Sequence, residues 1–305
     1  MPASQAATVA NGATNGVTNG ATNGATNGAS IGKAAKLCRS PGALCSFYKN
    51  DTCCGRLLCT VPTDCGVGGG LDGCLPVCRN QTVGEFEKIQ FPLDVGTAPG
   101  FEVGPKTQPA VIVVQIAEQG YRVLVPDLYR GDIALEVTQA LRLRGELNWN
   151  EGIKDVQYAA KYLKSTGSPK VAIVGFCMGG TMAFCGAQYA DVDAAIVFYG
   201  LVEDHIPCDP LKIPTSVPVQ VQFGGDDSIT TVAAVKPVVR AMREEGIDAQ
   251  LYVYPGLPHA YLNAITPEGR QLRIVMGQDF RTANETLVTL SFARMISFLR
   301  QHIGS

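Results

Sequence analysis

Charge of either sign is scarce in this 305-residue chain, in which 17% of the residues are charged and the formal net charge is −2. A chain so close to neutral gives no reason to expect nucleic acid or an anionic membrane surface as a partner. Apolar runs are also short, and none approaches the ~20 residues that a membrane-spanning helix needs. The first thirty residues lack the basic start and continuous apolar stretch of a secretory signal. These absences predict no nucleic-acid partner, no membrane partner and a cytoplasmic location.

The beginning of the chain has almost nothing to bury. Residues 11–30 repeat Asn-Gly-Ala/Val-Thr. Such a tract cannot offset the conformational entropy that ordering would cost. We therefore predict a disordered, low-complexity tail over residues 1–35.

Cysteine is distributed very unevenly. Eight of the eleven cysteines lie in one early segment: Cys38, Cys45, Cys53, Cys54, Cys59, Cys65, Cys74 and Cys78. This segment, residues 36–80, is rich in glycine and proline and has few large apolar side chains, so cross-links would have to replace a hydrophobic core. It has no histidine and no C-x2-C pair, so zinc-finger spacing is missing.

The order C-x6-C-x7-C-C-x4-C in this segment resembles the opening of a knottin, a small disulfide-knotted domain. The resemblance favours a disulfide-bonded module, through which we expect any protein partner to bind. Reduced cysteines in a disordered linker are the alternative. A disulfide framework would indicate secretion, which conflicts with the lack of a recognisable signal.

From about residue 84 the sequence alternates between short apolar runs and amphipathic stretches. Six runs predict strands: Ala110–Gln115, Tyr121–Pro126, Lys170–Gly175, Val192–Tyr199, Val217–Phe223 and Ala249–Tyr254. Helices are predicted at about 149–165, 178–190, 231–245 and 284–302. The alternation predicts an α/β domain over 84–305, with a mainly parallel sheet and helices on both faces.

The most informative motif is Gly175-Phe-Cys177-Met-Gly179-Gly180, between a predicted strand and a predicted helix. It has the form of a nucleophile elbow, with cysteine in place of the commoner serine. The sharp turn predicts a strained backbone at Cys177. Gly175 and Gly179 have no side chain to obstruct the turn, and Gly180 allows the following helix to pack closely. A thiol at a helix N-terminus is favoured as thiolate, and the N–H of Met178 would face an oxyanion.

Chain order supports this interpretation. Gly224-Gly225-Asp226-Asp227 places an acid after a late strand, and His259 follows the next strand. Nucleophile, acid and histidine in this order are typical of α/β-hydrolases. Asp227 is the predicted acid, with Asp226 as the alternative. His205 and His302 are interpreted as surface residues.

These motifs, together with Pro126-Asp-Leu-Tyr129, resemble the dienelactone hydrolase family over about residues 84–303. The resemblance implies an α/β-hydrolase fold and opening of a small lactone or ester by a cysteine thiolate. Cys177 would be the nucleophile, His259 the general base and acid, and Asp227 the carboxylate that orients it. It implies no metal and no organic cofactor.

One junction departs from the family. Only Ile-Ala-Glu-Gln-Gly joins the first two predicted strands, although neighbouring parallel strands need a crossover of about a dozen residues or more. In the family, this gap holds a helix and a loop whose N–H completes the oxyanion hole. Ile116 takes that place here, and Glu118 aligns with the end of the lost helix. We interpret the junction as an internal deletion, which makes the activity of this chain doubtful.

The predicted substrate contacts are Tyr129, Arg130 and Asn263. The family clamps a substrate carboxylate with arginines, but Asn263 stands where one of them is expected. Arg130 is offset by one position, and a surface arginine is the alternative. A less acidic substrate is therefore predicted. Cys185 and Cys208 are interpreted as unpaired, which favours a reducing compartment.

Two classes of function compete. The first is a cysteine-dependent hydrolase of a small lactone or ester, and the second is a non-catalytic interaction protein with a truncated hydrolase domain. A thiol peptidase is disfavoured, because nothing in the sequence builds an extended peptide groove. Iodoacetamide labelling separates the first two, since only an activated Cys177 reacts much faster than Cys185.

Overall fold

A computed structural model describes residues 57–60, 77–80, 87–112, 119–134, 137–265 and 284–304. All of them belong to one compact unit, Lys36–Ser305. The predicted tail and most of the cysteine-rich segment lie outside the described residues. Within that segment, β1 (Leu57–Thr60) and β2 (Val77–Asn80) form a two-stranded antiparallel ribbon, in which Cys59 and Cys78 are register partners.

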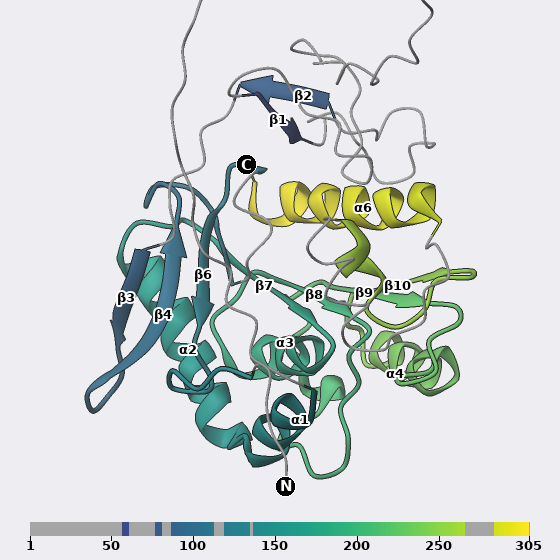
Figure 1. The fold of residues 1–305 in the computed structure, drawn as a ribbon, viewed down its shortest axis with the longest axis horizontal. Coiled ribbons are helices and arrows are strands. Elements are labelled where there is room, and N and C mark those ends of the chain that lie inside the picture. Colours follow the sequence, from purple (N-terminus) through teal and green to yellow (C-terminus); the bar gives the residue numbers. More distant parts are fainter. Residues whose placement is uncertain are drawn as a thin grey trace, which may run out of the picture. The chain divides into compact units, whose positions relative to one another are not determined.

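The main sheet has eight strands in the order β10-β9-β8-β7-β5-β6-β4-β3 (Figure 1). Their bounds are β3 Glu87–Pro92, β4 Thr97–Val103, β5 Ala110–Ile112, β6 Arg122–Pro126, β7 Val171–Phe176, β8 Ala194–Phe198, β9 Val219–Gly224 and β10 Ala249–Tyr254. All pairings from β6 to β10 are parallel, whereas β4 pairs antiparallel with both β3 and β6. This confirms the predicted α/β architecture.

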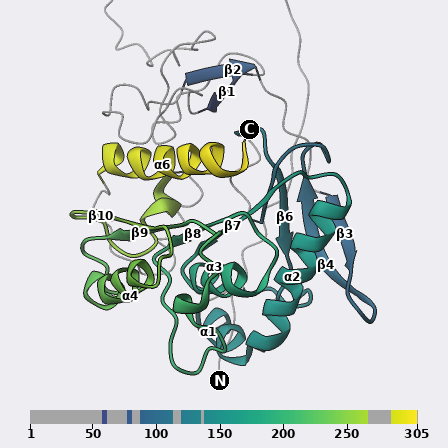
Figure 2. The ribbon, with the colours of Figure 1, turned by 180° about the vertical axis from the view of Figure 1, so that it is seen from behind.

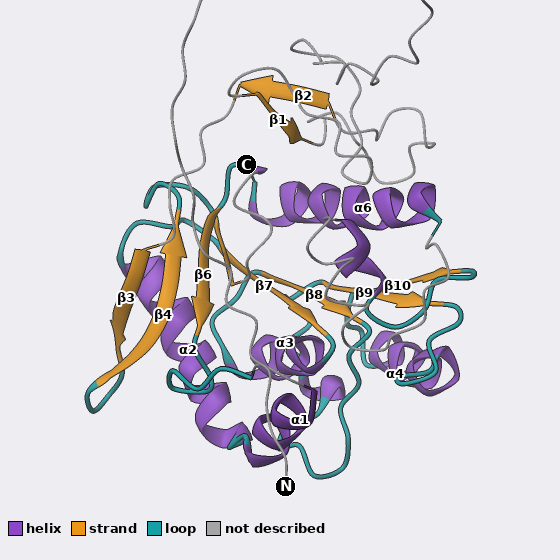
Figure 3. Ribbon diagram, in the orientation of Figure 1, coloured by secondary structure: helices purple, strands orange, loops and turns teal. Residues whose placement is uncertain are grey.

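Five α-helices among the described residues accompany the sheet (Figure 3): α1 Val137–Glu146, α2 Trp149–Ser165, α3 Met178–Tyr189, α4 Val232–Glu244 and α6 Glu285–Ile303. Four of them agree with the predicted ranges to within one or two residues. Asn148, Thr231 and Asn284 cap the N-termini of α2, α4 and α6 by accepting backbone N–H bonds. α1, β3 and β4 were not predicted, because their sequences lack a clear apolar period.

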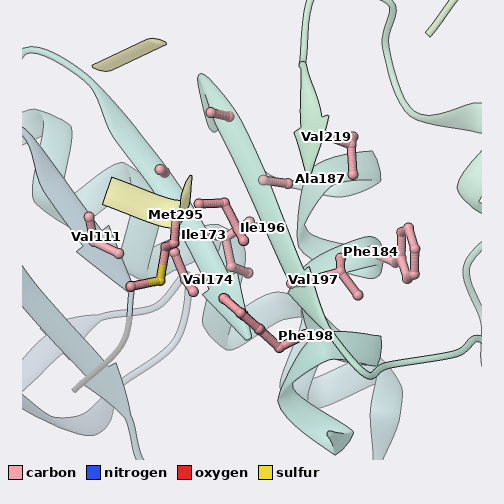
Figure 4. Packing of buried hydrophobic residues seen from close by; sticks show 14 of the residues in the cluster. Val111, Ile173, Val174, Phe184, Ala187, Ile196, Val197, Phe198, Val219 and Met295 are labelled. Atoms are coloured by element: carbon pink, nitrogen blue, oxygen red, sulfur yellow. The ribbon is translucent and has the colours of Figure 1, made fainter. Parts of the chain in front are cut away.

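The helices form layers on the two faces of the sheet. α6 covers one face, and α2, α3 and α4 cover the other (Figures 1 and 2). The core around the central strands consists of buried aliphatic and aromatic side chains, among them Ile173, Ile196 and Phe198 (Figure 4). All three are at least 97% buried, which explains why β7 and β8 read as continuous apolar runs.

The short junction leaves the two strands that it joins as parallel neighbours. Ala110 pairs with Arg122 and Val111 with Val123. No helix lies between β5 and β6 in the residues that the structure describes there, 110–112 and 119–126. β5 itself is half the length of β7, with three residues against six. The prediction that the first crossover helix is missing therefore agrees with the described part of the junction.

A buried ion pair ties β4 to β6. Arg122 is fully buried, and its Nε lies 2.5 Å from Oε1 of Glu102. The same guanidinium donates to the carbonyl of Leu163 and to the hydroxyls of Thr166 and Ser168. The antiparallel edge is thus joined to the end of α2 by a satisfied polar network, not by apolar packing alone.

One prediction about cysteine is wrong. Cys185 and Cys208 form a disulfide that joins α3 to the loop between β8 and β9, with Cα atoms 5.2 Å apart. The two residues are 23 positions apart, so no sequence spacing marked them as partners. Because they are paired, Cys185 and Cys208 give no reason to expect a reducing compartment.

None of the described helices is both long enough and apolar enough to cross a bilayer.

Candidate active site

Cys177 occupies a sharp bend between β7 and α3. Its φ and ψ are +54° and −118°, in the region that favours glycine. Its N–H donates to the carbonyl of Phe198 on the neighbouring strand, and its own carbonyl accepts from the N–H groups of Gly180 and Thr181. These bonds hold the strained residue in place and leave the thiol exposed at the N-terminus of α3.

Glycine allows the bend where the backbone approaches itself. A Cβ at Gly175 would lie 1.7 Å from the carbonyl oxygen of Gly179, and one at Gly180 would lie 2.6 Å from that of Phe198. A Cβ at Gly179, by contrast, would meet nothing within 4 Å. The predicted steric requirement therefore holds for Gly175 and Gly180 but not for Gly179.

Asp227 and His259 form a buried pair beyond the ends of β9 and β10. Nδ1 of His259 lies 2.8 Å from Oδ2 of Asp227. The other carboxylate oxygen, Oδ1, accepts the backbone N–H groups of Ile229 and Thr230, each at 2.9 Å. Asp226 is exposed, as expected of a turn residue. Of the two acids that the sequence offered, the structure brings Asp227 to the histidine.

Thr230 links this pair to the neighbouring strand. Its hydroxyl lies 3.0 Å from Oδ2 of Asp227, 3.2 Å from Nδ1 of His259 and 2.9 Å from the carbonyl of Tyr199. The Tyr199 ring packs against the imidazole with 5.0 Å between ring centroids. Neither residue was singled out in the sequence, because both act through tertiary contacts that no spacing reveals.

The electrostatic surroundings favour a charged pair. Burial lowers the pKa of His259, but its bonds and charge contacts with Asp227 and Cys177 outweigh this and raise it to about 9. Burial raises the pKa of Asp227, yet the hydrogen bonds from His259 and Thr230 bring it below its usual value. Both pKa shifts indicate that the pair is more stable in its imidazolium–carboxylate form.

The Cys177 thiol responds to the same groups. Partial burial raises its pKa, but the hydrogen bond and charge of His259, the N–H of Met178 and the charge of Arg144 together lower it below the ordinary value. The imidazole Nε2 is buried and has no well-aligned hydrogen-bond partner among the described residues. The contact between the sulfur and the ring is therefore longer or less well aligned than a regular hydrogen bond.

The three predicted substrate contacts have different surroundings. The Tyr129 hydroxyl donates to the sulfur of Met178 at 3.1 Å, so it lies beside the bend. Arg130 instead forms an ion pair with the buried Asp155, with Nη1 and Oδ2 2.7 Å apart. Asn263 is half-buried in a short 3₁₀ turn after His259. Ile116, the predicted second oxyanion donor, lies outside the described residues.

Arg144 on α1 was missed by the sequence analysis, since that helix was not predicted. Burial raises the pKa of Tyr129, and the charge of Arg144 offsets part of that rise. The same charge contributes to the lowered pKa of Cys177. Arg144 also forms an exposed ion pair with Glu203. His205 is exposed and pairs with the same glutamate. No group of three or more His, Cys, Asp or Glu residues suited to a metal occurs among the described residues.

Comparison with known sequences gives a consistent family. The sequence profile described as the dienelactone hydrolase family matches residues 102–303, more than half of the chain. A carboxymethylenebutenolidase homologue from Aquifex aeolicus is 29% identical over 160 residues, which are 49% of this chain and 67% of that protein. One from Yersinia pestis is 29% identical over 193 residues, covering 53% of this chain and 71% of the relative.

Solved structures share the fold. A dienelactone hydrolase homologue from Klebsiella pneumoniae superposes with a TM-score of 0.52 at 21% identity, covering 65% of this chain and all of that one. A dienelactone hydrolase-like promiscuous phosphotriesterase from metagenomic libraries gives 0.59 at 18% identity, with 73% and 100% coverage. At these identities the structures support the fold alone, and the sequence match carries the assignment. With its elbow between β7 and α3 and an acid–histidine pair beyond β9 and β10, this chain belongs to the dienelactone hydrolase family and has the α/β-hydrolase fold.

Proposed function

We propose that the protein is a hydrolase that opens a small ester or lactone through the Cys177 thiolate. One observation carries the proposal: a thiol with a lowered pKa, exposed at a strained bend, interacts with an imidazole that is itself hydrogen-bonded to a carboxylate. This is the combination of nucleophile, base and orienting group that acyl transfer needs. Family membership supports ester-bond hydrolysis as the reaction class.

In the first half of the reaction, the Cys177 sulfur attacks the carbonyl carbon, and the carbonyl oxygen becomes an oxyanion. The N–H of Met178 donates to that oxyanion. When the tetrahedral species collapses, the carbon–oxygen bond to the alcohol breaks. His259, which is protonated at neutral pH because its pKa is about 9, gives its proton to the departing alkoxide and leaves a thioester.

In the second half, neutral His259 takes a proton from water, whose oxygen attacks the thioester carbonyl. The carbon–sulfur bond breaks, the acid is released, and thiolate and imidazolium are restored. Asp227 holds Nδ1 of the imidazole throughout and stabilises its positive charge. The N–H of Ile116 is the second donor that we assign to the oxyanion.

The substrate that we propose carries less negative charge than an anionic clamp would demand. Arg130 already neutralises the buried carboxylate of Asp155, so binding a substrate carboxylate there would leave Asp155 without its partner. Asn263 offers hydrogen bonds but no charge. Among the described residues, Tyr129 and Arg144 interact electrostatically with the thiol, and we assign them to contact a polar substituent.

The test is steady-state hydrolysis of p-nitrophenyl acetate and of a dienelactone by the full chain and by three variants. We expect Cys177→Ala to lose at least about 10³-fold in kcat/KM, since no other group supplies the nucleophile. Asp227→Asn should lose about 10²–10⁴-fold through the wrong imidazole tautomer. Asp226→Asn is the matched control and should keep the wild-type rate, because its side chain is exposed.

Equal rates for the wild type and Cys177→Ala would overturn the proposal and favour a non-catalytic interaction protein. A loss in Asp226→Asn as large as in Asp227→Asn would instead reject the assigned acid. Iodoacetamide labelling gives a check that does not depend on turnover, because Cys177 is the only free cysteine among the side chains that the structure describes.

A further inference from the structure

β9 carries two glutamines in a strand that is otherwise apolar. Gln220 and Gln222 are separated by one residue, so both side chains lie on the same face of the sheet, the one that α6 covers (Figure 1). Both residues are at least 98% buried. Burying an amide costs free energy unless its polar atoms are hydrogen-bonded. The proposed mechanism uses neither side chain.

Hydrogen bonds connect Gln222 to two neighbouring elements. Its Oε1 accepts from the hydroxyl of Ser291 on α6 at 2.6 Å and from that of Tyr254 on β10 at 2.7 Å. Because the Ser291 hydroxyl donates to this amide, it accepts from the hydroxyl of Tyr261, which lies 2.7 Å away. Nε2 of Gln222 donates to Oε1 of Gln220 at 2.7 Å. The bonds therefore run in one direction, from Tyr261 through Ser291 to Gln222.

Tyr261 anchors the loop that carries the histidine. It begins the 3₁₀ turn Tyr261–Ile265, two residues after His259. Between them, Ala260 has a φ of +55°, a left-handed conformation that is strained for a residue with a Cβ. Such a conformation persists only where its surroundings fix it. Tyr261 is fully buried and its hydroxyl is bonded to Ser291, so it fixes the chain on one side of the strained residue.

Gln222 also holds the ring on which the imidazole packs. Its main-chain carbonyl accepts the N–H of Tyr199 at 2.9 Å. The Tyr199 ring contacts the imidazole of His259, with 5.0 Å between centroids, and meets the ring of Tyr261 edge-on at 5.4 Å. The three rings form a row, and both tyrosines are joined to the same glutamine, one directly and one through the serine hydroxyl.

We propose that Gln222, Ser291 and Tyr261, here called the glutamine network, are positioning residues that hold the imidazole in place. All three are fully buried, so they act through the histidine loop and not on a substrate. What they preserve is the 2.8 Å contact between Nδ1 of His259 and Asp227. The effect on turnover rests on the proposed function, whereas the effect on the imidazole does not.

The first test removes one oxygen atom and keeps the ring. In Tyr261→Phe the contact with Asp227 should loosen, so the pKa of His259, about 9 in the wild type, should fall and its protonation constant should drop about fivefold, the equivalent of one hydrogen bond. The measurement is an NMR titration of the imidazoles, of which the chain has only three. Tyr162→Phe is the matched control, because it loses one phenolic hydrogen bond, to Glu102, in the other half of the sheet. It should leave the pKa of His259 unchanged.

A double variant tests whether the network acts as one chain. Ser291→Ala breaks the same link and should lower the protonation constant about as much as Tyr261→Phe. Tyr261→Phe/Ser291→Ala should give no further decrease, since either change alone already disconnects the loop from Gln222. Decreases that add in the double variant would overturn the network as a connected unit.

Turnover separates this proposal from the catalytic one. With ethyl acetate, whose alkoxide needs the proton of His259, kcat/KM of Tyr261→Phe should fall about fivefold at pH 7 or above, and its alkaline limb should move to lower pH. Tyr162→Phe should match the wild type in both.

A wild type that hydrolyses esters, with the pKa of His259 unchanged in Tyr261→Phe, would overturn the positioning role and leave the proposed function intact. A wild type that hydrolyses none, with the pKa still lowered in Tyr261→Phe, would reject the proposed function and keep the positioning role. Equal losses of Tm in Tyr261→Phe and Tyr162→Phe, with no change in either titration, would show a purely structural network and overturn the proposal.

Discussion

The two halves of the sheet, on either side of the bend at Cys177, are built on different principles. β7 to β10 are parallel and nearly equal in length, and every member is covered by helices. β3 to β6 combine an antiparallel edge, a three-residue strand and a charged pair buried at Arg122 and Glu102. The first half carries Cys177, Asp227 and His259, the three side chains of the proposed triad, and the second half contains the junction between β5 and β6.

The side chains of the proposed triad and the irregular strands thus lie in different parts of the sheet. Cys177, Asp227 and His259 follow β7, β9 and β10, so their positions depend on a regular part of the fold. β5 and β6 lie on the other side of β7 from β9 and β10 in the sheet. A chain can therefore lose a crossover in one half while the acid–histidine pair in the other half keeps its geometry.

The largest expected effect concerns the stability of the irregular half. Arg122→Leu removes a fully buried guanidinium and leaves Glu102 without its partner, which should lower the free energy of unfolding by about 3–5 kcal/mol. Urea denaturation measures it. The double variant Arg122→Leu/Glu102→Leu should recover part of the loss, since no buried charge is then left over. A single-variant loss below about 1 kcal/mol would show that apolar packing alone holds this edge.

The disulfide in the regular half comes next. Cys208→Ser opens the link to α3 and should cost about 2–4 kcal/mol of unfolding free energy, chiefly because the unfolded chain gains freedom. The same denaturation curves with dithiothreitol are the control, in which the difference between variant and wild type should disappear. A difference that persists under reduction would mean that the serine itself, and not the lost link, is responsible.

A smaller effect concerns thiol reactivity at the border between the halves. His259→Gln removes the hydrogen bond and charge that lower the pKa of Cys177, while partial burial continues to raise it. Since only the thiolate reacts, alkylation by iodoacetamide at pH 7 should slow about 10–100-fold. In the wild type the rate should fall only as the pH drops through the lowered pKa of Cys177, and in the variant the midpoint should lie above about 8.5.

Peptide mass spectrometry distinguishes Cys177 from the early cysteines in that experiment. His205→Gln is the matched control, because His205 is exposed and pairs with Glu203. Its profile should coincide with that of the wild type. Coinciding profiles for His259→Gln and the wild type would mean that the imidazole does not activate the sulfur.

The smallest effect tests positioning within the regular half. Thr230→Val removes the hydroxyl that bridges Asp227, His259 and the carbonyl of Tyr199. One lost hydrogen bond of about 1 kcal/mol predicts a fall of about fivefold in kcat, with KM unchanged. The pH profile of kcat should shift with it, and Thr230→Ser should restore both. A change in Tm alone, without a shift in the profile, would indicate a purely structural role.

Much of the regular half could be predicted from the sequence, because β7 and β8 are almost wholly buried and read as unbroken apolar runs. The predicted strand at residues 249–254 coincides with β10. The predicted C-terminal ends of β7 and β9 differ from the observed ones by one residue. The order of Cys177, Asp227 and His259 along the chain was the basis for predicting the candidate site. The assignment of Asp227 over Asp226 relied on spacing, which the burial of the two side chains supports.

Other features could not be predicted, because they depend on tertiary distance. β3 and β4 form an edge with a mixed pattern of exposure, and Arg122 sits inside an apolar run where a charge is unexpected. Cys185 and Cys208 meet only because α3 packs against the loop that follows β8. Thr230 and Arg144 likewise interact with residues that lie far away in the chain.

The tight turn at Gly175 has a consequence for how such enzymes change their chemistry. The main chain, through the contact of that glycine with the carbonyl of Gly179 and the bond from Cys177 to Phe198, decides where the reacting atom stands. None of these main-chain contacts involves the Cys177 side chain. Sulfur and oxygen are therefore exchangeable at the tip without rebuilding the scaffold, and one base change in the codon would alter the leaving-group preference while every supporting contact survived.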